Sequence, residues 1–219
     1  MRIVVFGANG ATGQLLVADA LMRGHKVVAV TRRPDAFPVK DARVEIVRAD
    51  VTSGAGLVAA VSGCDAVASA LGAAGYSRKP ITVYSAGTKA IVSAMREAHC
   101  KRVVVVSSGL TYPPAPGHGF FVDYIIVPIL HDRIGRTLYA DMRAMEEFLR
   151  AQPDIDWTVI RPGRLINGDV GRPYVKVPDT PSGRVTTRKD LAKVILDEIE
   201  SGADVHAAMA VTSASKWFF

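Results

Sequence analysis

Three glycines spaced three residues apart, Gly7, Gly10 and Gly13, constrain the fold of this chain more than any other feature. An apolar run at residues 3–6 precedes them, and its pattern predicts a strand. A helical pattern at residues 11–23 follows, and Gly24 is placed to end it. The apolar face expected for this helix consists of Leu15, Leu16, Ala18, Ala20 and Leu21. The glycines therefore predict a tight turn from the first strand into the first helix.

This turn favours binding of a dinucleotide. Glycine lets the backbone approach a pyrophosphate, and the N-terminus of the helix presents free N–H groups to it. The alternative is a turn with no ligand, but the position between the first strand and the first helix is the confirming context. The residues expected to form the phosphate loop are Gly7, Asn9, Gly10, Ala11, Thr12 and Gly13.

The rest of the chain alternates short apolar runs with helical segments. Strands are predicted at residues 27–30, 44–47, 66–71, 103–106, 157–160 and 206–211, and helices at 57–61, 81–98, 138–151 and 187–201. Thr187 is the expected N-cap of the last helix. This alternation predicts an α/β fold, a Rossmann-type doubly wound parallel sheet with helices on both faces. We expect one domain, residues 1–219, with a small C-terminal substrate lobe contributed mainly by about residues 112–136 and 163–186.

Composition limits the class of protein and its partners. The net charge of +6 raises nucleic acid as a partner, but the basic residues come singly or in pairs, so nucleic-acid binding is not expected. No run reaches the ~18 apolar residues of a membrane span. The chain enters a strand at its first residues, which predicts no signal peptide and a cytoplasmic location.

The cysteines and histidines show no pattern of a metal site. Cys64 and Cys100 are far apart and form no CxxC pair, so we expect reduced thiols. The five histidines are scattered without ligand spacing, so no metal is expected.

The end of the second strand distinguishes between cofactors. A site for NADH has an acidic residue there, whereas the 2′-phosphate of NADPH requires cations. The chain places Arg32 and Arg33 at this point, and Asp35 comes only after Pro34. The two arginines could simply be solvated, but the arginine fork matches phosphate well. The sequence favours NADPH over NADH.

Several short motifs occur in the order seen in atypical short-chain dehydrogenases. They are Gly7 to Gly13, Arg32, Ala49-Asp50-Val51, Ala70-Leu71-Gly72, Ser107-Ser108 and Ile160-Arg161-Pro162-Gly163. The chain resembles the NAD(P)H-binding branch that contains biliverdin-IXβ/flavin reductases and NmrA-like proteins. The resemblance covers about residues 1–212, and it is more specific for the cofactor than for the substrate.

The resemblance implies a role for each motif along the cofactor. Asp50 and Val51 would flank the adenine, although Asp50 could equally be a turn former. Ala70, Leu71 and Gly72 would line the cofactor after the fourth strand.

The nicotinamide end would lie between two further motifs. Ser107 and Ser108 end a strand, and Ser108 would face the nicotinamide and a polar group of the substrate. Pro162 and Gly163 would close over the same end. Both serines could instead satisfy backbone groups at the strand end.

One departure from the wider superfamily concerns proton transfer. Short-chain dehydrogenases typically carry Tyr-x-x-x-Lys, in which the lysine lowers the pKa of the tyrosine. Here Tyr139 is followed at the fourth place by Arg143, and alignment on the next residues puts Met142 at the lysine position. Tyr139 is therefore either a weak catalytic candidate aided by Arg143 or an ordinary helix tyrosine.

Three functions remain open from the sequence. The first is an NADPH-dependent reductase of a flavin, quinone or similar planar substrate, and the second is an NmrA-like NADP(H) sensor. The third is an epimerase or dehydratase-like enzyme. The aromatic residues of the segment 112–131 would suit a planar substrate, but the run 120–130 could equally be core or the contact of a homodimer, as could residues 217–219.

Overall fold

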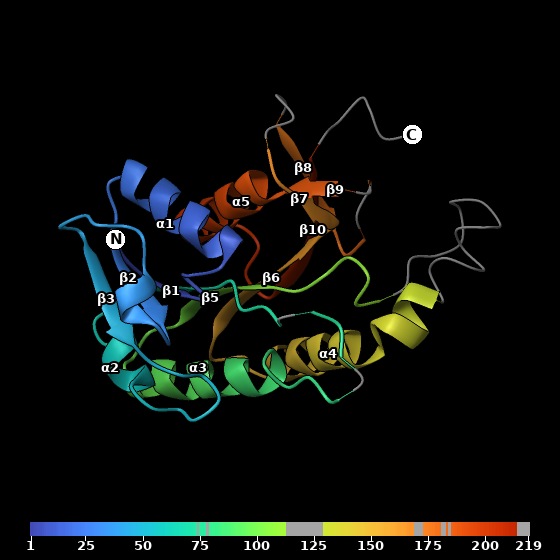
Figure 1. Cartoon of the computed structure of the whole chain (residues 1–219), viewed down its shortest axis with the longest axis horizontal. Coiled ribbons are helices and arrows are strands. Elements are labelled where there is room, and N and C mark those ends of the chain that lie inside the picture. The colour runs from blue at the N-terminus through green and yellow to red at the C-terminus, as the bar shows by residue number, and fades with distance from the viewer. Residues whose placement is uncertain are drawn as a thin grey trace.

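Eight strands form one sheet in the order β3-β2-β1-β4-β5-β6-β10-β8 (Figure 1). The computed structural model describes residues 1–73, 75–77, 79–112, 129–168, 173–180, 183 and 185–213. The strands are β1 (Arg2–Phe6), β2 (Lys26–Thr31), β3 (Val44–Arg48), β4 (Ala66–Ser69), β5 (Arg102–Val106), β6 (Asp156–Pro162), β8 (Tyr174–Pro178) and β10 (Ala207–Ser213). All pair in parallel except β8, which lies antiparallel to β10. The predicted Rossmann-type doubly wound sheet is confirmed.

Helices cover both faces of this sheet. Helices α1 (Ala11–Met22) and α5 (Arg188–Ser201) lie together on one face, and α2 (Leu57–Val61), α3 (Ser85–Glu97) and α4 (Arg136–Arg150) lie on the other. Alternate residues of each strand face opposite sides, so Val4 and Phe6 join one core cluster while Ile3 and Val5 join the second. The central strands are thus buried on both faces, as the apolar runs predicted, whereas the edge strands β3 and β8 are partly exposed.

The order of the strands reverses between β1 and β4. Both strands pair in parallel with their neighbours, but β1 leads outward to β2 and β4 leads outward to β5. In sheets of this kind, ligands bind in the crevice at the carboxyl ends of the strands where the order reverses. The loop that contains Gly7 and Gly10 follows β1 at this place.

The structure corrects the predicted apolar face of the first helix. Leu15 is 40% exposed and Ala18 is exposed, whereas Leu16, Val17 and Leu21 face the core. The error arose because counting apolar residues made the face too wide, while the face that packs on the sheet is narrower.

Helix α3 begins at Ser85 rather than at residue 81. The carboxylate of Asp141, from α4, accepts hydrogen bonds from the backbone N–H groups of Tyr84 (2.8 Å) and Ser85 (3.2 Å). A residue 56 positions away therefore caps this helix, which no local pattern could indicate. The cap of α5 is confirmed, because Thr187 Oγ1 accepts a hydrogen bond of 2.9 Å from the N–H of Asp190.

Several short elements escaped the sequence patterns, the edge strand β8 among them. Strands β7 (Arg164–Ile166) and β9 (Val185–Thr187) pair in parallel as a separate small sheet. The 3-10 helix η1 (Pro34–Ala36) follows β2, and η3 (Ile129–Ile134) is a π-helical segment before α4. In the part of the chain that the structure describes, no helix is long and apolar enough to cross a membrane.

Candidate functional site

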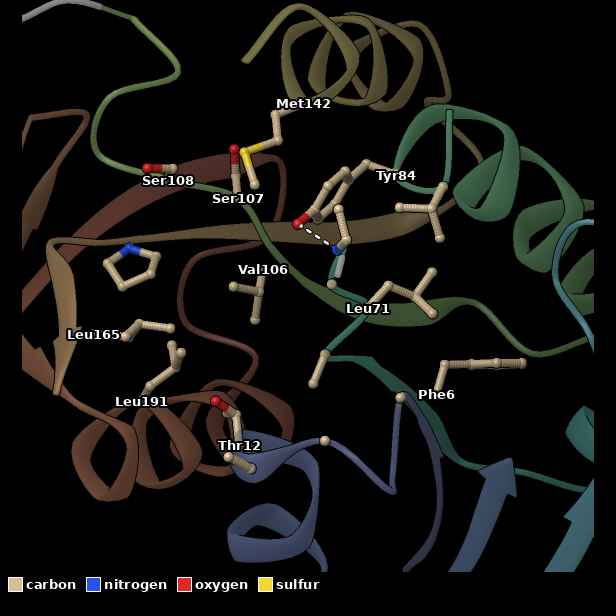
Figure 2. A pocket seen from close by; sticks show the side chains of 18 of the residues that line it. Phe6, Thr12, Leu71, Tyr84, Val106, Ser107, Ser108, Met142, Leu165 and Leu191 are labelled. Atoms are coloured by element: carbon tan, nitrogen blue, oxygen red, sulfur yellow. Dashed lines mark hydrogen bonds between the residues drawn. The ribbon is translucent and has the colours of Figure 1, made fainter. Parts of the chain in front are cut away.

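A cavity of about 1120 Å³ lies over the carboxyl ends of the central strands. The residues after β1, β2, β4, β5 and β6 all contribute to its wall. Figure 2 shows Thr12, Leu71, Ser108 and Leu165 among them. Each residue that the sequence assigned to the cofactor or to catalysis lines this cavity, except Gly13. The fold therefore brings together residues that lie up to 156 positions apart in the chain, from Gly7 to Gly163.

The three glycines of the loop differ in what they do. Gly7 has φ +75°, and a Cβ there would lie 2.4 Å from the carbonyl oxygen of Ala70. A Cβ on Gly13 would lie 2.2 Å from the carbonyl oxygen of Gly7, so Gly13 serves the packing of the loop on α1. Gly10 is exposed, lines the cavity and has the ordinary φ of −72°, and a Cβ there would come no closer to the protein than 3.2 Å, from the carbonyl oxygen of Gly7. Gly10 is therefore the glycine that leaves room for a ligand.

The first turn of α1 is open to an anion. Gly10 is the N-cap, no side chain caps the helix, and the first turn contains no acidic residue. The first N–H groups of a helix have no partner within it and carry its positive dipole end. This cradle fits a pyrophosphate.

Asn9 connects the loop to the end of β2. Its Nδ2 donates to Thr31 Oγ1 at 3.2 Å and to the carbonyl oxygen of Arg33 at 3.5 Å. Its Oδ1 is buried and accepts no hydrogen bond from the described residues. A buried acceptor without a donor is costly, so a ligand with hydroxyl donors, such as a ribose, fits this position.

The charges around the end of β2 are mostly positive. Arg32 and Arg33 are exposed and line the cavity. Asp50 lines it too, and its Oδ1 accepts bonds from the N–H and the hydroxyl of Thr52, at 2.9 and 2.6 Å. These bonds hold the pKa of Asp50 below its usual value. Asp50 is thus a turn former, as one alternative predicted, and a cavity residue as well.

The middle of the cavity rests on contacts that the sequence did not indicate. A Cβ on Gly87 of α3 would lie 3.0 Å from Leu71 Cδ1 and 3.1 Å from Val51 Cγ2, so this glycine lets both apolar side chains reach the cavity. Tyr84 lines the cavity, and its hydroxyl accepts a 3.1 Å hydrogen bond from the N–H of Ala73 (Figure 2). Burial raises the pKa of Tyr84, so it stays neutral.

The adjacent serines after β5 have different hydrogen bonds. Ser107 is buried, and its hydroxyl donates to Glu146 Oε1 at 2.7 Å and shares a 2.9 Å bond with Thr111. Figure 2 shows Ser107 turned toward Met142 of α4. Ser108 Oγ accepts from the N–H of Leu110 at 3.2 Å, and no described residue receives its O–H. Ser108 is therefore the serine that can donate a hydrogen bond into the cavity.

A buried ion pair holds Ser107 in place. Glu146 is completely buried, and Arg161 donates to its two oxygens from Nε (3.1 Å) and Nη2 (2.5 Å). Arg150 adds a third contact of 3.1 Å. A carboxylate removed from water in this way is stable only because it is paired and hydrogen-bonded. Glu146 lies in the part of α4 that served only for the alignment of Met142, and the sequence did not single it out as functional.

Tyr139 is not arranged as an activated tyrosine. It lines the cavity and stacks on His131, with ring centroids 5.3 Å apart and an angle of 2°. Burial raises its pKa, and a hydrogen bond with Tyr76 acts in the same direction. Arg143 instead donates to the carbonyl oxygen of Thr111 at 3.2 Å. Assistance of Tyr139 by Arg143 is thus not supported by the geometry.

Tyr112 does not belong to an aromatic wall of the cavity. Its ring lies under the guanidinium groups of Arg161 (4.7 Å), Arg143 (5.4 Å) and Arg150 (5.5 Å), and its hydroxyl accepts from Arg150 at 2.9 Å. Cation–π contacts of this kind fix the ring among the cations. Of the other aromatic residues expected to form the wall, His131 stacks on Tyr139, and those at residues 118–124 lie outside the described residues, as do residues 217–219.

At the nicotinamide end the sequence identified only part of the wall. Pro162 and Gly163 line it, and the N–H of Gly163 donates to Thr186 Oγ1 at 2.9 Å. The sequence missed a further set, namely Tyr76, Arg164, Leu165, Arg188 and Leu191. The position of Arg164 directly after the Pro162-Gly163 motif was the feature of the sequence that could have placed it in the cavity wall.

The fold and this site define an NAD(P)-binding Rossmann protein. The family model for NAD(P)H-binding proteins matches residues 7–201, and the chain belongs to this family. The resemblance found in the sequence is confirmed at this level.

Two relatives cover nearly the whole chain. A protein of Arabidopsis thaliana, described as chloroplastic, is 30% identical over 227 residues, which cover 98% of this chain and 79% of that protein. The crystal structure of a Burkholderia pseudomallei protein described as exported is also 30% identical, with a TM-score of 0.79 and coverage of 97% and 100%. The cytoplasmic location expected from the sequence therefore stays a prediction.

More distant structures share the fold. A short-chain dehydrogenase/reductase of Veillonella parvula, crystallised with NADP, is 19% identical with a TM-score of 0.78, covering 99% of this chain and 96% of that one. A Streptococcus pneumoniae structure described as an NADH-flavin reductase is 21% identical with a TM-score of 0.76, covering 98% and 100%.

Proposed function

We propose that this protein is an NADPH-dependent reductase that transfers hydride to a flavin, a quinone or a similar planar conjugated acceptor. The observation that carries the proposal is the nicotinamide end of the cavity. It offers a free hydroxyl on Ser108 but, in the described part of the chain, no acid whose pKa is lowered toward neutrality. The site is built to orient an acceptor rather than to protonate it.

The residues of the chain would hold the cofactor along the cavity. Gly10 and the first turn of α1 would receive the pyrophosphate, and Asn9 Oδ1 would accept from a ribose hydroxyl. Val51 and Leu71 would pack against the adenine half and the middle of the cofactor. When bound, NADPH supplies the hydride.

The choice of NADPH over NADH rests on the end of β2. Arg32 and Arg33 line the cavity there, and the acidic residue that binds a ribose 2′-hydroxyl in NAD sites has no counterpart in β2. Guanidinium groups match a phosphate in charge and in geometry. The NADP found in the Veillonella parvula structure supports this choice by analogy of fold.

The class of acceptor follows from the chemistry of proton transfer. Reduction of a simple ketone creates an alkoxide, which needs a positioned acid with a pKa near the working pH. The raised pKa of Tyr139 makes it a poor acid, and Arg143 contacts Thr111 instead. A conjugated acceptor delocalises the incoming charge and can take its proton later from water. Such acceptors therefore suit the site better.

The experiment is NADPH oxidation, followed by loss of NADPH absorbance, against flavins, quinones, tetrapyrroles and aliphatic ketones. We expect turnover with the conjugated acceptors and little with ketones. Ser108→Ala should lower turnover several-fold, since a neutral hydrogen bond contributes about 0.5–1.5 kcal/mol. Tyr139→Phe should matter less. Loss of nearly all activity in Tyr139→Phe, together with faster turnover of ketones, would refute the mechanism.

One observation favours a second function, a sensor of NADP(H) of the NmrA-like kind. The cation that accompanies the tyrosine in typical short-chain dehydrogenases is replaced by Met142, which lines the cavity as an apolar residue. A sensor needs the cofactor site but not the chemistry. Tight NADPH binding without turnover of any acceptor in the panel would select this function.

A further inference from the structure

Two arginines stand at the end of the cavity opposite Arg32 and Arg33. Arg164 is the first residue of β7, and Arg188 is the first residue of α5. Both line the cavity. Strand β7 pairs in parallel with β9, with Arg164 opposite Val185 and Ile166 opposite Thr187. Arg164 therefore lies at the first pair of this small sheet, and Arg188 lies one residue beyond the last pair, roughly 10 Å further along the strands at ~3.3 Å for each residue.

This second pair of cations is too far from β2 to serve the same phosphate. Four strand steps separate β2 from β6, through β1, β4 and β5. At ~4.8 Å for each step, the end of β6, from which Arg164 follows, lies roughly 19 Å from the end of β2. A ligand group at Arg164 is therefore distinct from one at Arg32.

Within the described residues, no carboxylate compensates the charge of either arginine. Arg188 Nη1 donates to Asn167 Oδ1 at 2.7 Å, a neutral amide that uses few of its five N–H donors. No described acidic side chain pairs with Arg164 or Arg188. The nearby carboxylates are engaged elsewhere: Asp190 accepts from Thr187 and Ser213, and Asp179 lies 3.3 Å from Arg161.

We propose that Arg164 and Arg188 form a second anion subsite, which binds a phosphate or carboxylate group carried by the acceptor. The inference rests on the proposed function only for the identity of this acceptor. Two guanidinium groups in one cavity wall, neither paired with a described carboxylate, attract an anionic group, and a guanidinium can bind such a group in a bidentate manner. Among flavins the subsite would select FMN over riboflavin, because the two differ only in the 5′-phosphate.

The test measures binding rather than turnover. FMN and riboflavin are titrated separately into the protein saturated with NADP⁺, with flavin fluorescence as the readout. The variants are Arg188→Ala, Arg164→Ala and the double variant. Lys189→Ala is the control, since it removes a positive charge from the next position of α5, outside the cavity wall.

We expect the double variant to lose tenfold or more in affinity for FMN and to bind riboflavin and NADP⁺ as the wild type does. Equal affinities for FMN and riboflavin in the wild type would overturn the proposal. So would a loss of NADP⁺ affinity at an unchanged FMN preference, which would assign the two arginines to the cofactor pyrophosphate. FMN binding that depends on the arginines, without any turnover, would support the subsite while contradicting the reductase.

A different observation concerns the two cysteines. Cys64 and Cys100 lie just before β4 and β5, and their sulfur atoms are 2.6 Å apart. Cys100 is buried, and Cys64 is partly exposed. The sequence predicted reduced thiols but gave no sign of this contact, because the parallel pairing of β4 with β5 creates it.

We infer that Cys64 and Cys100 are a site of reversible disulfide formation. With hydrogen peroxide as the oxidant, the two thiols lose two protons and two electrons, one S–S bond forms, the O–O bond breaks, and two waters result. The bond would join the amino ends of two neighbouring strands. The cavity lies at the opposite, carboxyl ends, so we expect oxidation to stabilise the fold and leave cofactor binding unchanged.

Intact mass and thermal unfolding test this site before and after mild peroxide treatment. We expect a loss of two hydrogens, no free thiols, and a rise in Tm of roughly 5–15 °C that a reductant reverses. NADPH affinity should stay the same, and Cys64→Ser should show no rise in Tm. Two free thiols after treatment, or a disulfide only between molecules, would overturn the inference.

Discussion

Glu146 offers the sharpest test of what holds the nicotinamide end of the cavity together. The variant Glu146→Gln keeps the shape of the side chain but removes its charge. Asp179 is then the remaining described carboxylate beside the buried Arg161. Its Oδ1 lies 3.3 Å from Arg161 Nη1, but its side chain is 74% exposed. Breaking a buried pair by removing one partner costs about 3–5 kcal/mol. The expected fall in Tm is roughly 6–20 °C, at ~2–4 °C for each kcal/mol in a chain of this size.

Urea unfolding with a shared m-value measures the loss. The control is Asp154→Asn, which breaks an exposed pair with Arg96 at 2.7 Å and should change little. The double variant Glu146→Leu/Arg161→Met removes both charges and should be less destabilised than Glu146→Gln, because no unpaired charge stays buried. A loss below about 1 kcal/mol in Glu146→Gln would refute the assignment of a buried, charged pair.

Three further results are expected. Replacing Arg32 and Arg33 by Ala should weaken the binding of NADPH at least tenfold more than the binding of NADH, since a charge-assisted contact contributes about 1.5–3 kcal/mol. Equal losses of affinity for the two cofactors, measured by calorimetry, would contradict this. Gly10→Val should abolish NADPH binding in a folded protein, as titration with NADPH would show. Gly7→Ala should destabilise the fold itself, because its Cβ would lie 2.4 Å from a carbonyl oxygen, and circular dichroism would detect this loss. Burial raises the folded-state pKa of Tyr139, so its contribution to stability is complete below about pH 10 and declines above it. Unfolding free energies should therefore fall less steeply above pH 10 in Tyr139→Phe, and parallel slopes would exclude Tyr139 as a cause.

The parts of the fold that the sequence predicted correctly were those with a local cause. The run of valines in β5 and the glycine turn after β1 each carry their signal within a few residues. Thr187 likewise caps α5 through a residue three positions away. The phosphate loop is similar, because the strand, the turn and the helix that build it are consecutive.

The parts that could not be predicted depend on residues that are distant in the chain. Asp141 sets the start of α3, and Gly87 makes room for Leu71 and Val51, yet neither shows a pattern of its own. The short pair β7 and β9 has too few residues for a periodic signal. Such features become visible only once the sheet has placed the elements side by side.

The serine pair after β5 shows how this limit bears on function. Ser107 and Ser108 are identical in type and adjacent, so no sequence pattern could give them different roles. The difference comes from Glu146, 39 positions after Ser107, whose carboxylate accepts the hydrogen bond that the Ser107 hydroxyl donates. No described residue accepts one from Ser108. Arg161 lies on β6, next to β5, and forms the ion pair with Glu146. Glu146 thus connects Arg161 on β6 with Ser107 at the end of β5, beneath the nicotinamide end of the cavity. The strongest charges near the acceptor are thereby paired with each other, which leaves a neutral hydroxyl, rather than a titrating acid, to meet the substrate.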